Sequence, residues 1–396
     1  MNLNNLLTCR NILDDKIFQD ASDDFFKTSE LIKYAEEIGL SGNIFRAYLI
    51  YILSHETNLI SETLEKQSGK IGESLKKCFV RDLEILLPVF ENKNLPESEF
   101  VKNYIPTEKN NIESFNELEK SLDNINDAEK IADIFIAHYK KYGCGDIADY
   151  RAFSWSEENK NLVGIKHFEK ISLNDLIGYA HQKELLTKNT TAFIENKPAN
   201  NVLLVGARGT GKSSGVKALV NEYYKKSLRL LQITKPQLKK LPEIMETLRK
   251  FASKKFIIFL DDLSFEESDA EYKYLKSAIE GGVAARPENV LIYATSNRRH
   301  LIRETWRDRI DGQDELYRDD SVNETISLSD RFGLIIQYYS PTQDEYLEII
   351  RYMLKKNGIE MDAEKLRVEG LRWEMSHSGR NGRTAQQFVN YFLGNR

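Results

Sequence analysis

The chain has 396 residues, of which 41% are hydrophobic and 30% are charged, and its formal net charge at pH 7 is −5. This composition is typical of a soluble globular protein with two or three domains. No apolar run approaches the ~20 residues that a membrane-spanning helix requires, and the N-terminus lacks the charged-then-apolar layout of a secretion signal. We therefore expect a cytoplasmic protein with no membrane partner, in which Cys9, Cys78 and Cys144 are reduced.

Charge is distributed unevenly along the chain. Residues 1–150 hold 17 of the 56 Lys and Arg residues and 27 of the 61 Asp and Glu residues, a balance of −10, so the rest carries +5. The acidic front is a poor candidate for binding nucleic acid by bulk charge, because such binding depends on cations that neutralise phosphates. The remainder is compatible with nucleic-acid binding without being strongly basic, and the sequence leaves that partner open.

The first part of the chain, residues 1–165, has the spacing of amphipathic helices. Apolar residues recur three and four positions apart, as in Phe45, Leu49, Ile52 and Leu53. This pattern predicts an all-α N-terminal region, either one domain or two. No cluster of His, Cys or carboxylate side chains in it has a spacing that indicates chemistry, so we interpret the region as a candidate partner-binding domain.

The pattern changes near residue 165, where short apolar runs begin to alternate with helical segments. We predict strands at residues 202–205, 228–233, 256–260, 290–295 and 334–339, and helices between them at residues 213–224, 242–252 and 270–280. This alternation predicts an α/β domain over residues 166–340, with a parallel sheet and helices on both faces. After Pro341 the pattern is helical again, over residues 341–396.

A glycine-rich loop follows the first of these strands, in the string VLLVGARGTGKSSGVKAL. Gly206, Gly211, Lys212 and Ser213 match the P-loop pattern Gly-x-x-x-x-Gly-Lys-Ser/Thr. Glycines let successive N–H groups face phosphate oxygens, and the helix that follows adds the positive end of its dipole. We expect ATP and Mg²⁺ as cofactors, with Lys212 on the β- and γ-phosphates and Ser213 on Mg²⁺. The other predicted nucleotide-binding residues of the loop are Arg208, Gly209, Thr210 and Ser214.

Two further strands end in polar side chains that suit the same site. The strand at residues 256–260 leads into Asp261 and Asp262, the Walker B arrangement, at the carboxyl end where open α/β sheets bind ligands. We predict that Asp261 binds water of the Mg²⁺ shell, and that Asp262 orients or deprotonates the attacking water. Asn297 follows the strand at residues 290–295, and its neutral amide is predicted to hold that water beside the γ-phosphate.

The order of these motifs resembles that of AAA+ ATPases, over roughly residues 173–396. The resemblance implies a small helical lid at residues 341–396. It also implies an arginine before the last strand that acts on the nucleotide of a neighbouring subunit, here Arg331, and therefore a homo-oligomer. A second sensing arginine at the start of a lid helix is implied at Arg383, with Arg380 as the alternative. Ile177 and Gly178 lie in the segment that resembles the one packing on adenine.

Longer strings resemble one uncharacterised bacterial AAA+ family, catalogued as a domain of unknown function. These strings are residues 199–204 together with the P-loop, 286–290, 294–301 and 327–333. Many AAA+ proteins end Walker B with Asp-Glu, whereas this chain has Asp261 and Asp262. Because the Asp262 side chain is shorter, we expect slow hydrolysis that serves as a switch; helicase loaders and replication initiators of this class also carry Asp-Asp.

Three uses of ATP are compatible with these motifs. The first is remodelling or switching of a protein partner held by the N-terminal region. The second is a nucleic-acid-linked activity similar to that of helicase loaders, which a basic run after the 290–295 strand favours. The third is an ATP-regulated assembly scaffold with little turnover. The basic run consists of Arg298, Arg299, His300, Arg303, Arg307 and Arg309.

Overall fold

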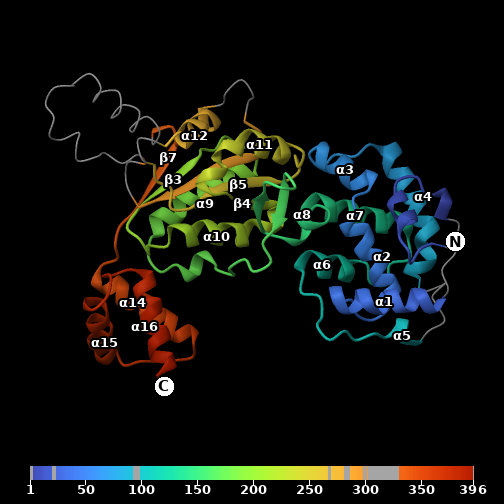
Figure 1. Cartoon of the computed structure of the whole chain (residues 1–396). Coiled ribbons are helices and arrows are strands. Elements are labelled where there is room, and N and C mark those ends of the chain that lie inside the picture. Colours follow the sequence, from blue (N-terminus) through green and yellow to red (C-terminus); the bar gives the residue numbers. More distant parts are fainter. Residues whose placement is uncertain are drawn as a thin grey trace.

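The computed structural model describes residues 3–19, 24–91, 99–265, 269–280, 286–297, 301 and 330–395. Figure 1 shows an N-terminal helical region, a central sheet covered by helices, and a small C-terminal helical region. The two helical regions, blue and red in the figure, lie on opposite sides of the central part. No helix within these residues is long and apolar enough to cross a membrane.

The N-terminal region packs its helices around one apolar core. Its elements are η1 (Leu3–Asn5), η2 (Arg10–Asp14), α1 (Asp24–Ile38), α2 (Ile44–His55), α3 (Leu59–Lys66), α4 (Glu73–Phe90), α5 (Glu99–Lys102), α6 (Glu113–Ser121), α7 (Ala128–Lys141) and α8 (Asp146–Asp149). Nine of the 12 residues of α2 are buried, as expected of a helix that is apolar all round. Asp82 of α4 is also buried, and its carboxylate accepts the backbone N–H groups of Leu7 and Thr8, which ties down the start of the chain.

The described residues form a seven-stranded sheet in the order β2-β1-β4-β5-β6-β3-β7. The strands are β1 (Ala152–Ser156), β2 (Asn161–Gly164), β3 (Val202–Gly206), β4 (Leu228–Gln232), β5 (Lys255–Leu260), β6 (Val290–Ser296) and β7 (Leu334–Tyr338). Neighbouring strands are parallel, except that β1 and β2 are antiparallel. Because β5 pairs with β6 and β6 with β3, the carboxyl ends of these three strands lie side by side.

Helices cover both faces of the sheet, as predicted. On one face, α9 (Ala180–Ile194) and α10 (Lys212–Tyr223) place Leu186 and Leu219 in a core with Leu204 of β3. On the other face, α11 (Leu241–Arg249) and α12 (Glu271–Glu280) contribute Leu248 and Leu275 to a second core. The short elements η3 (Leu173–Asp175), η4 (Tyr224–Lys226) and η5 (Lys235–Lys240) lie in the connections. The predicted fold class, an α/β parallel sheet with helical regions at both ends of the chain, is therefore confirmed.

The prediction of a helical region up to residue 165 is wrong for its last part, where β1 and β2 form one edge of the sheet. Phe153 and Trp155 of β1 and Leu162 of β2 enter the core beneath α11. Strands of five and four residues contain too few alternating positions to display a period in the sequence. Pairing with β4 decides their conformation instead. The helical region therefore ends with α8, at Asp149.

A buried arginine of the sheet holds the end of the N-terminal region. Arg229 of β4 is fully buried and donates hydrogen bonds to the carbonyl oxygens of Tyr142 at 2.8 Å and Ile147 at 2.9 Å. Two further bonds reach the carbonyl oxygens of Tyr224 and Leu228 within the sheet domain. The guanidinium thus donates hydrogen bonds to backbone carbonyl oxygens on both sides of the junction. These bonds offset the free-energy cost of burying its charge.

A buried lysine makes a second connection nearby. Lys254, just before β5, donates to the carbonyl oxygens of Tyr139 at 2.9 Å and Lys140 at 3.0 Å, in the last turn of α7. Its Nζ also lies 3.2 Å from a carboxylate oxygen of Glu65 in α3. A cation at a helix C-terminus pairs with unsatisfied carbonyl groups and with the negative end of the helix dipole. Burial lowers the pKa of Lys254 to about 8, although Glu65 opposes the shift, so the side chain is still charged at neutral pH.

The C-terminal region, as far as the structure describes it, is a bundle of α14 (Gln343–Lys356), α15 (Ala363–Met375) and α16 (Gly382–Gly394). The three helices share a small separate core, which includes Ile350, Leu366 and Phe388. Side chains of the preceding residues cap the helices; Asn381, for example, accepts the backbone N–H of Thr384 at 2.9 Å. The bundle follows β7, at the opposite edge of the sheet from β1 and β2.

Candidate functional site

The P-loop connects the end of β3 to the start of α10. Gly206, Gly209 and Gly211 have φ angles of 145°, 74° and 86°, which other residues rarely adopt. A Cβ atom at Gly206 would lie 2.0 Å from the carbonyl oxygen of Tyr338 in β7, so the neighbouring strand leaves no room for a side chain. The first residues of α10 line a pocket, and a helix N-terminus offers free backbone N–H groups to an anion.

Lys212 is buried at the base of this loop. Its Nζ donates to the carbonyl oxygens of Gly206 and Ala207, each at 2.7 Å, and to Oδ1 of Asn297 at 3.2 Å. Burial lowers the pKa of Lys212, while the carboxylates of Asp261 and Asp262 oppose that shift. The ammonium group is therefore held at the end of the loop, close to the ends of β5 and β6.

Ser213 and Asp261 bring a hydroxyl and a carboxylate together. Ser213 Oγ donates to Oδ1 of Asp261 at 2.5 Å, and Thr295 Oγ1 donates to the same oxygen at 2.6 Å. Thr295, in β6, is buried, and its hydroxyl also accepts the backbone N–H of Asp262 at 2.9 Å. Mg²⁺ prefers oxygen ligands, commonly one or two carboxylates completed by water and phosphate oxygens. The donor set therefore fits Mg²⁺, which Ser213 and Asp261 would hold.

Asp262 adopts a strained backbone conformation, with φ of 52° in the left-handed region. One of its carboxylate oxygens accepts a hydrogen bond from Nδ2 of Asn297. The other lies 3.8 Å from Nη2 of Arg208 in the P-loop. Non-glycine residues held in this region cost about 1–3 kcal/mol and cluster at active sites, so the conformation is consistent with a chemical role for Asp262.

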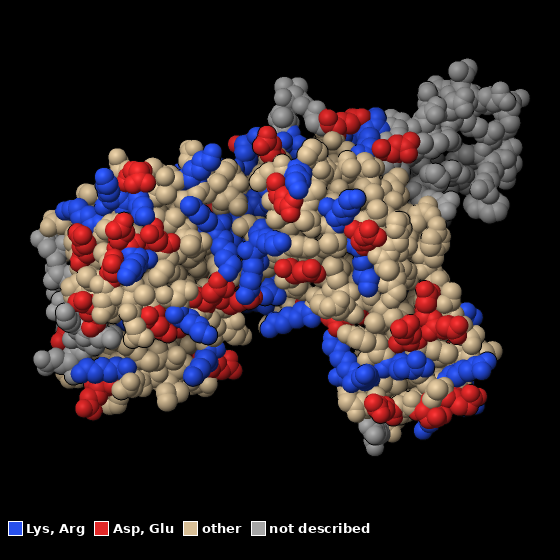
Figure 2. All heavy atoms as spheres, turned by 180° about the vertical axis from the view of Figure 1, so that it is seen from behind, with Lys and Arg blue, Asp and Glu red and all other residues tan. Residues whose placement is uncertain are grey.

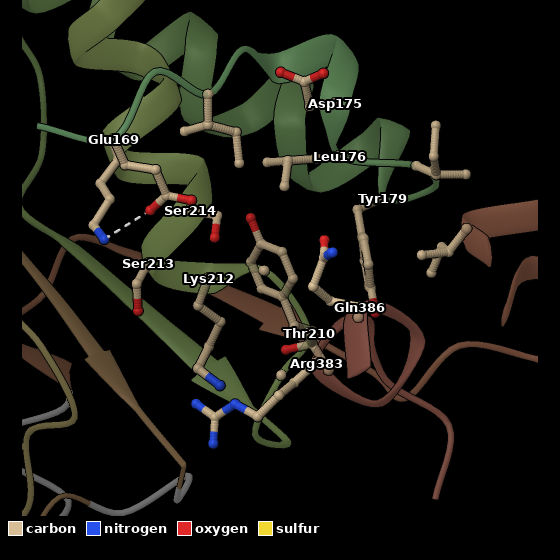
Figure 3. A pocket seen from close by; sticks show the side chains of 18 of the residues that line it. Glu169, Asp175, Leu176, Tyr179, Thr210, Lys212, Ser213, Ser214, Arg383 and Gln386 are labelled. Atoms are coloured by element: carbon tan, nitrogen blue, oxygen red, sulfur yellow. Dashed lines mark hydrogen bonds and ion pairs between the residues drawn. The ribbon is translucent and has the colours of Figure 1, made fainter. Parts of the chain in front are cut away.

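These residues line one pocket of about 820 Å³ between the sheet domain and the C-terminal bundle. In Figure 3 the tips of Lys212 and Arg383 approach one another at one end, near Ser213. The other end is more apolar, and Leu176 and Tyr179 point into it from the segment before α9. Other apolar side chains that line the pocket and belong to neither the P-loop nor the strand ends include Ile177, Ile349 and Met353.

The start of α16 contacts the P-loop directly. The backbone N–H of Gly382 donates to the carbonyl oxygen of Gly209 at 2.8 Å. A Cβ atom at Gly209 would lie 2.5 Å from Oδ1 of Asn381, so this glycine also permits the close approach of the bundle. Arg383 follows and lines the pocket, whereas the alternative, Arg380, pairs with Glu374 of α15 at 2.9 Å and does not line it.

Most of the residues predicted from the sequence line this pocket, and three of the predicted set do not. Gly206 lies behind the loop against β7, and Gly178 turns the chain with φ of 78° between two lining residues. Arg331 pairs through Nε with Glu280, at the end of α12. The basic run at Arg298, Arg299, His300, Arg303, Arg307 and Arg309 lies outside the described residues.

Two residues of the pocket, Thr295 and Asp175, are not among those predicted from the sequence. Thr295 lies in β6, two positions before Asn297, which directly follows the strand; two-residue spacing directs side chains to the same side, which is the signal that was available. The second residue is Asp175 of η3, which accepts hydrogen bonds from Tyr352 at 2.8 Å and Lys356 at 2.6 Å in α14. No sequence signal could have paired residues this far apart along the chain.

The fold and the site together define a P-loop protein of the AAA+ class. The P-loop strand lies beside β6, the Walker B carboxylates follow β5, and a C-terminal helical bundle covers the pocket. Residues 148–396 match the model of a protein family described as "Protein of unknown function (DUF815)". The chain belongs to this family, as the longer sequence strings predict. The matched region begins within α8, just before β1.

Several solved structures are similar to the chain. One is the Thermotoga maritima RuvB Holliday junction branch migration motor, with 18% identity and a TM-score of 0.39 over 55% of this chain and 63% of that chain. Two variants of Thermotoga maritima RuvB have identities of 17% and 19% and TM-scores of 0.37 and 0.39, over 56% and 55% of this chain and 71% and 64% of theirs. The chain thus spans less than two thirds of the first of these structures. No curated protein matches the chain.

Proposed function

We propose that the chain binds ATP with Mg²⁺ and hydrolyses it. One observation supports this most directly. A network of hydrogen bonds, completed by Thr295, joins residues from three separate segments at the P-loop: Lys212, Ser213, Asp261, Asp262 and Asn297. Ion-pair networks elsewhere in a protein need neither a glycine loop nor a helix N-terminus. Here both accompany the cluster, as phosphoryl transfer requires.

Each residue has a distinct role in the proposed reaction. Lys212 and the N–H groups of the P-loop bind the phosphates, and Arg383 approaches them from the bundle. Mg²⁺, held by Ser213 and Asp261, would neutralise charge on the β- and γ-phosphates. Asp262 orients the attacking water and accepts its proton. Asn297 holds that water beside the γ-phosphate, and its hydrogen bond to Asp262 also fixes the position of the carboxylate.

The apolar end of the pocket would receive the adenine. Leu176, Ile177 and Tyr179 come from the segment before α9, whereas Ile349 and Met353 come from α14, so both parts of the molecule would contact the base. Nucleotide binding would therefore depend on how the C-terminal bundle is placed against the sheet. This arrangement suits an ATPase that acts as a switch, and it gives the bundle the role of a lid.

We further propose a homo-oligomer in which Arg331 of one copy acts on the nucleotide of the next. Arg331 does not line the pocket of its own chain, and Glu280 holds it beside α12. A cation supplied to the γ-phosphate by a neighbour can raise turnover by orders of magnitude. A monomer with full turnover would contradict this role.

We propose that the chain acts in the cytoplasm. We also propose that its acidic N-terminal region binds a protein partner. Figure 2 shows both acidic and basic side chains on the face opposite to that in Figure 1, with a group of basic side chains near the middle of that face. Near the border with the sheet domain, Lys225 pairs with Glu113 at 2.8 Å, and among the residues that line the pocket Lys217 pairs with Glu169 at 3.0 Å. Such pairing reduces the free positive charge available to phosphates. A protein partner is therefore favoured over nucleic acid.

Two substitutions test the ATPase proposal. We expect Lys212→Ala to abolish ATP binding, because the phosphates lose their buried cation, and Asp262→Ala to retain binding but lose turnover. Calorimetry with ATP and phosphate release measure the two effects, and Arg380→Ala serves as the control because Arg380 does not line the pocket. Undiminished phosphate release by Asp262→Ala would contradict its assigned role.

The same Asp262→Ala variant serves to identify the partner. Affinity purification with ATP should retain a protein that is lost when Lys212→Ala is used as the bait. Salt-dependent binding to DNA by the full chain would instead support the nucleic-acid-linked activity. A change of assembly size with ATP, without phosphate release, would support the scaffold.

A further inference from the structure

Arg208 occupies a position of the P-loop where the motif itself requires no particular side chain. It lies between Ala207 and Gly209, lines the pocket, and has 75% of its side chain exposed. Its Nη2 lies 3.8 Å from Oδ2 of Asp262. A phosphate-binding loop therefore carries an arginine that faces the residue proposed to act on the attacking water.

The carboxylate of Asp262 stands between two partners. Asn297 donates to Oδ1 through Nδ2, and its own Oδ1 accepts from Lys212 at 3.2 Å. Arg208 faces the remaining oxygen, Oδ2. Lys212 and Arg208 are thus the two cationic ends of one chain of side chains, and this chain runs along the end of the pocket where the terminal phosphate would bind.

The pair between Arg208 and Asp262 is weak enough to be exchanged. Both side chains are largely exposed, at 75% and 61%, and exposed ion pairs at such distances contribute little free energy. A γ-phosphate can accept two parallel charge-assisted hydrogen bonds from the guanidinium, in place of a single 3.8 Å contact with Asp262, and it carries more charge than a carboxylate. A γ-phosphate in the P-loop would therefore compete with Asp262 for Arg208, whereas ADP ends one phosphate earlier.

We propose that Arg208 is a positioning residue that distinguishes ATP from ADP within its own chain. With ADP it stays paired with Asp262; with ATP it moves to the γ-phosphate and leaves the Asp262 carboxylate to the attacking water. This inference rests on the proposed ATPase function. It adds a nucleotide-dependent step that requires no neighbouring subunit, unlike the role proposed for Arg331.

The test compares affinities for ADP and for a slowly hydrolysed ATP analogue, each with Mg²⁺, using the full chain. We expect Arg208→Gln to weaken binding of the ATP analogue about tenfold and to leave ADP affinity within about twofold, because only the triphosphate would lose a charge-assisted contact. Arg208→Lys should recover part of the lost affinity for the ATP analogue, because lysine keeps the positive charge but lacks the paired N–H donors of a guanidinium. Arg380→Gln, which removes an exposed arginine that does not line the pocket, is the matched control.

A double-mutant cycle separates this role from simple phosphate binding. If Asp262 competes for Arg208, Asp262→Asn should raise the preference for the ATP analogue over ADP more in the native background than in Arg208→Gln. The inference would be overturned if Asp262→Asn changed the preference equally in both backgrounds, or if Arg208→Gln left the ratio of the two affinities unchanged. Either result would leave the ATPase proposal intact. Failure of the native chain to bind either nucleotide would overturn both.

Discussion

The two helical regions of this protein join the same sheet in different ways. The N-terminal region is held by Lys254 and Glu65, with 0% and 11% of their side chains exposed. The C-terminal bundle is held by Lys356 and Asp175, with 58% and 17% exposed. Water competes for the second pair much more than for the first, so its contribution to stability is smaller.

The nucleotide pocket lies on the side of the weaker junction. Besides the pair at Asp175, the bundle contacts the sheet domain through a backbone hydrogen bond from Gly382 to Gly209 and through Ile177, which packs on the core of the bundle. The N-terminal region should therefore move with the sheet as one body. The bundle can change its position at a lower cost, as a lid over a nucleotide would need to do.

The largest predicted effect breaks the buried junction. Lys254→Met should lower the free energy of unfolding by about 3 kcal/mol, because Glu65 and the carbonyl oxygens of Tyr139 and Lys140 lose a buried cation. Urea unfolding measures this loss. Lys250→Met, a nearby exposed lysine, is the control and should change little. Equal stability of the two variants would contradict a strong contribution of Lys254 to the N-terminal junction.

A second prediction uses pH to weaken the N-terminal region alone. Burial lowers the pKa of His138 in α7 to about 3, and the positive charge of nearby Lys254 adds to the shift. Between this value and the usual 6.5 the unfolded chain binds the extra proton, so stability must fall as the pH falls through this range. From pH 7 to pH 5 the loss is about 2 kcal/mol. His138→Gln should make urea unfolding less dependent on pH by that amount, and an unchanged slope would contradict the assignment.

The smallest effect is expected at the junction of the C-terminal bundle with the sheet domain. Asp175→Asn should lower the free energy of unfolding by less than about 1 kcal/mol, because its lysine partner is largely exposed. It should nevertheless speed hydrogen exchange in α14 and leave exchange in α7 unchanged. Lys365→Met, which removes only the pair with Glu369 inside α15, is the matched control. Faster exchange in both helices would indicate general destabilisation rather than release of the C-terminal bundle.

The same junction has a defined pH dependence. Burial acts to raise the pKa of Asp175, but hydrogen bonds from Lys356, Ser172 and Tyr352 outweigh it and bring the pKa below its usual 3.8. The Asp175 carboxyl group therefore releases its proton more readily in the folded state than in the unfolded chain. The contribution of the junction is complete above about pH 4 and is lost as the pH falls through the lowered pKa.

Prediction from the sequence succeeded where one short segment contains the whole signal. The P-loop, the Walker B pair and the strand before Asn297 were each identified from fewer than twenty consecutive residues, and all of them reach the pocket. Prediction failed at β1 and β2, which depend on pairing with β4. It also missed Thr295, because two-residue spacing places this threonine beside Asn297 but does not reveal the two aspartates that it joins.

The sequence by itself determined the fold class, the phosphate-binding loop and most of the pocket residues, because glycine spacing, apolar runs and strand-end carboxylates act locally. Only the tertiary structure decided that Arg208 faces Asp262 and that Asp175 meets Lys356, 181 positions further along the chain. It alone also decided that Arg383, rather than Arg380, enters the pocket. These contacts depend on how separate elements pack, and packing is a property of the whole fold rather than of any one segment.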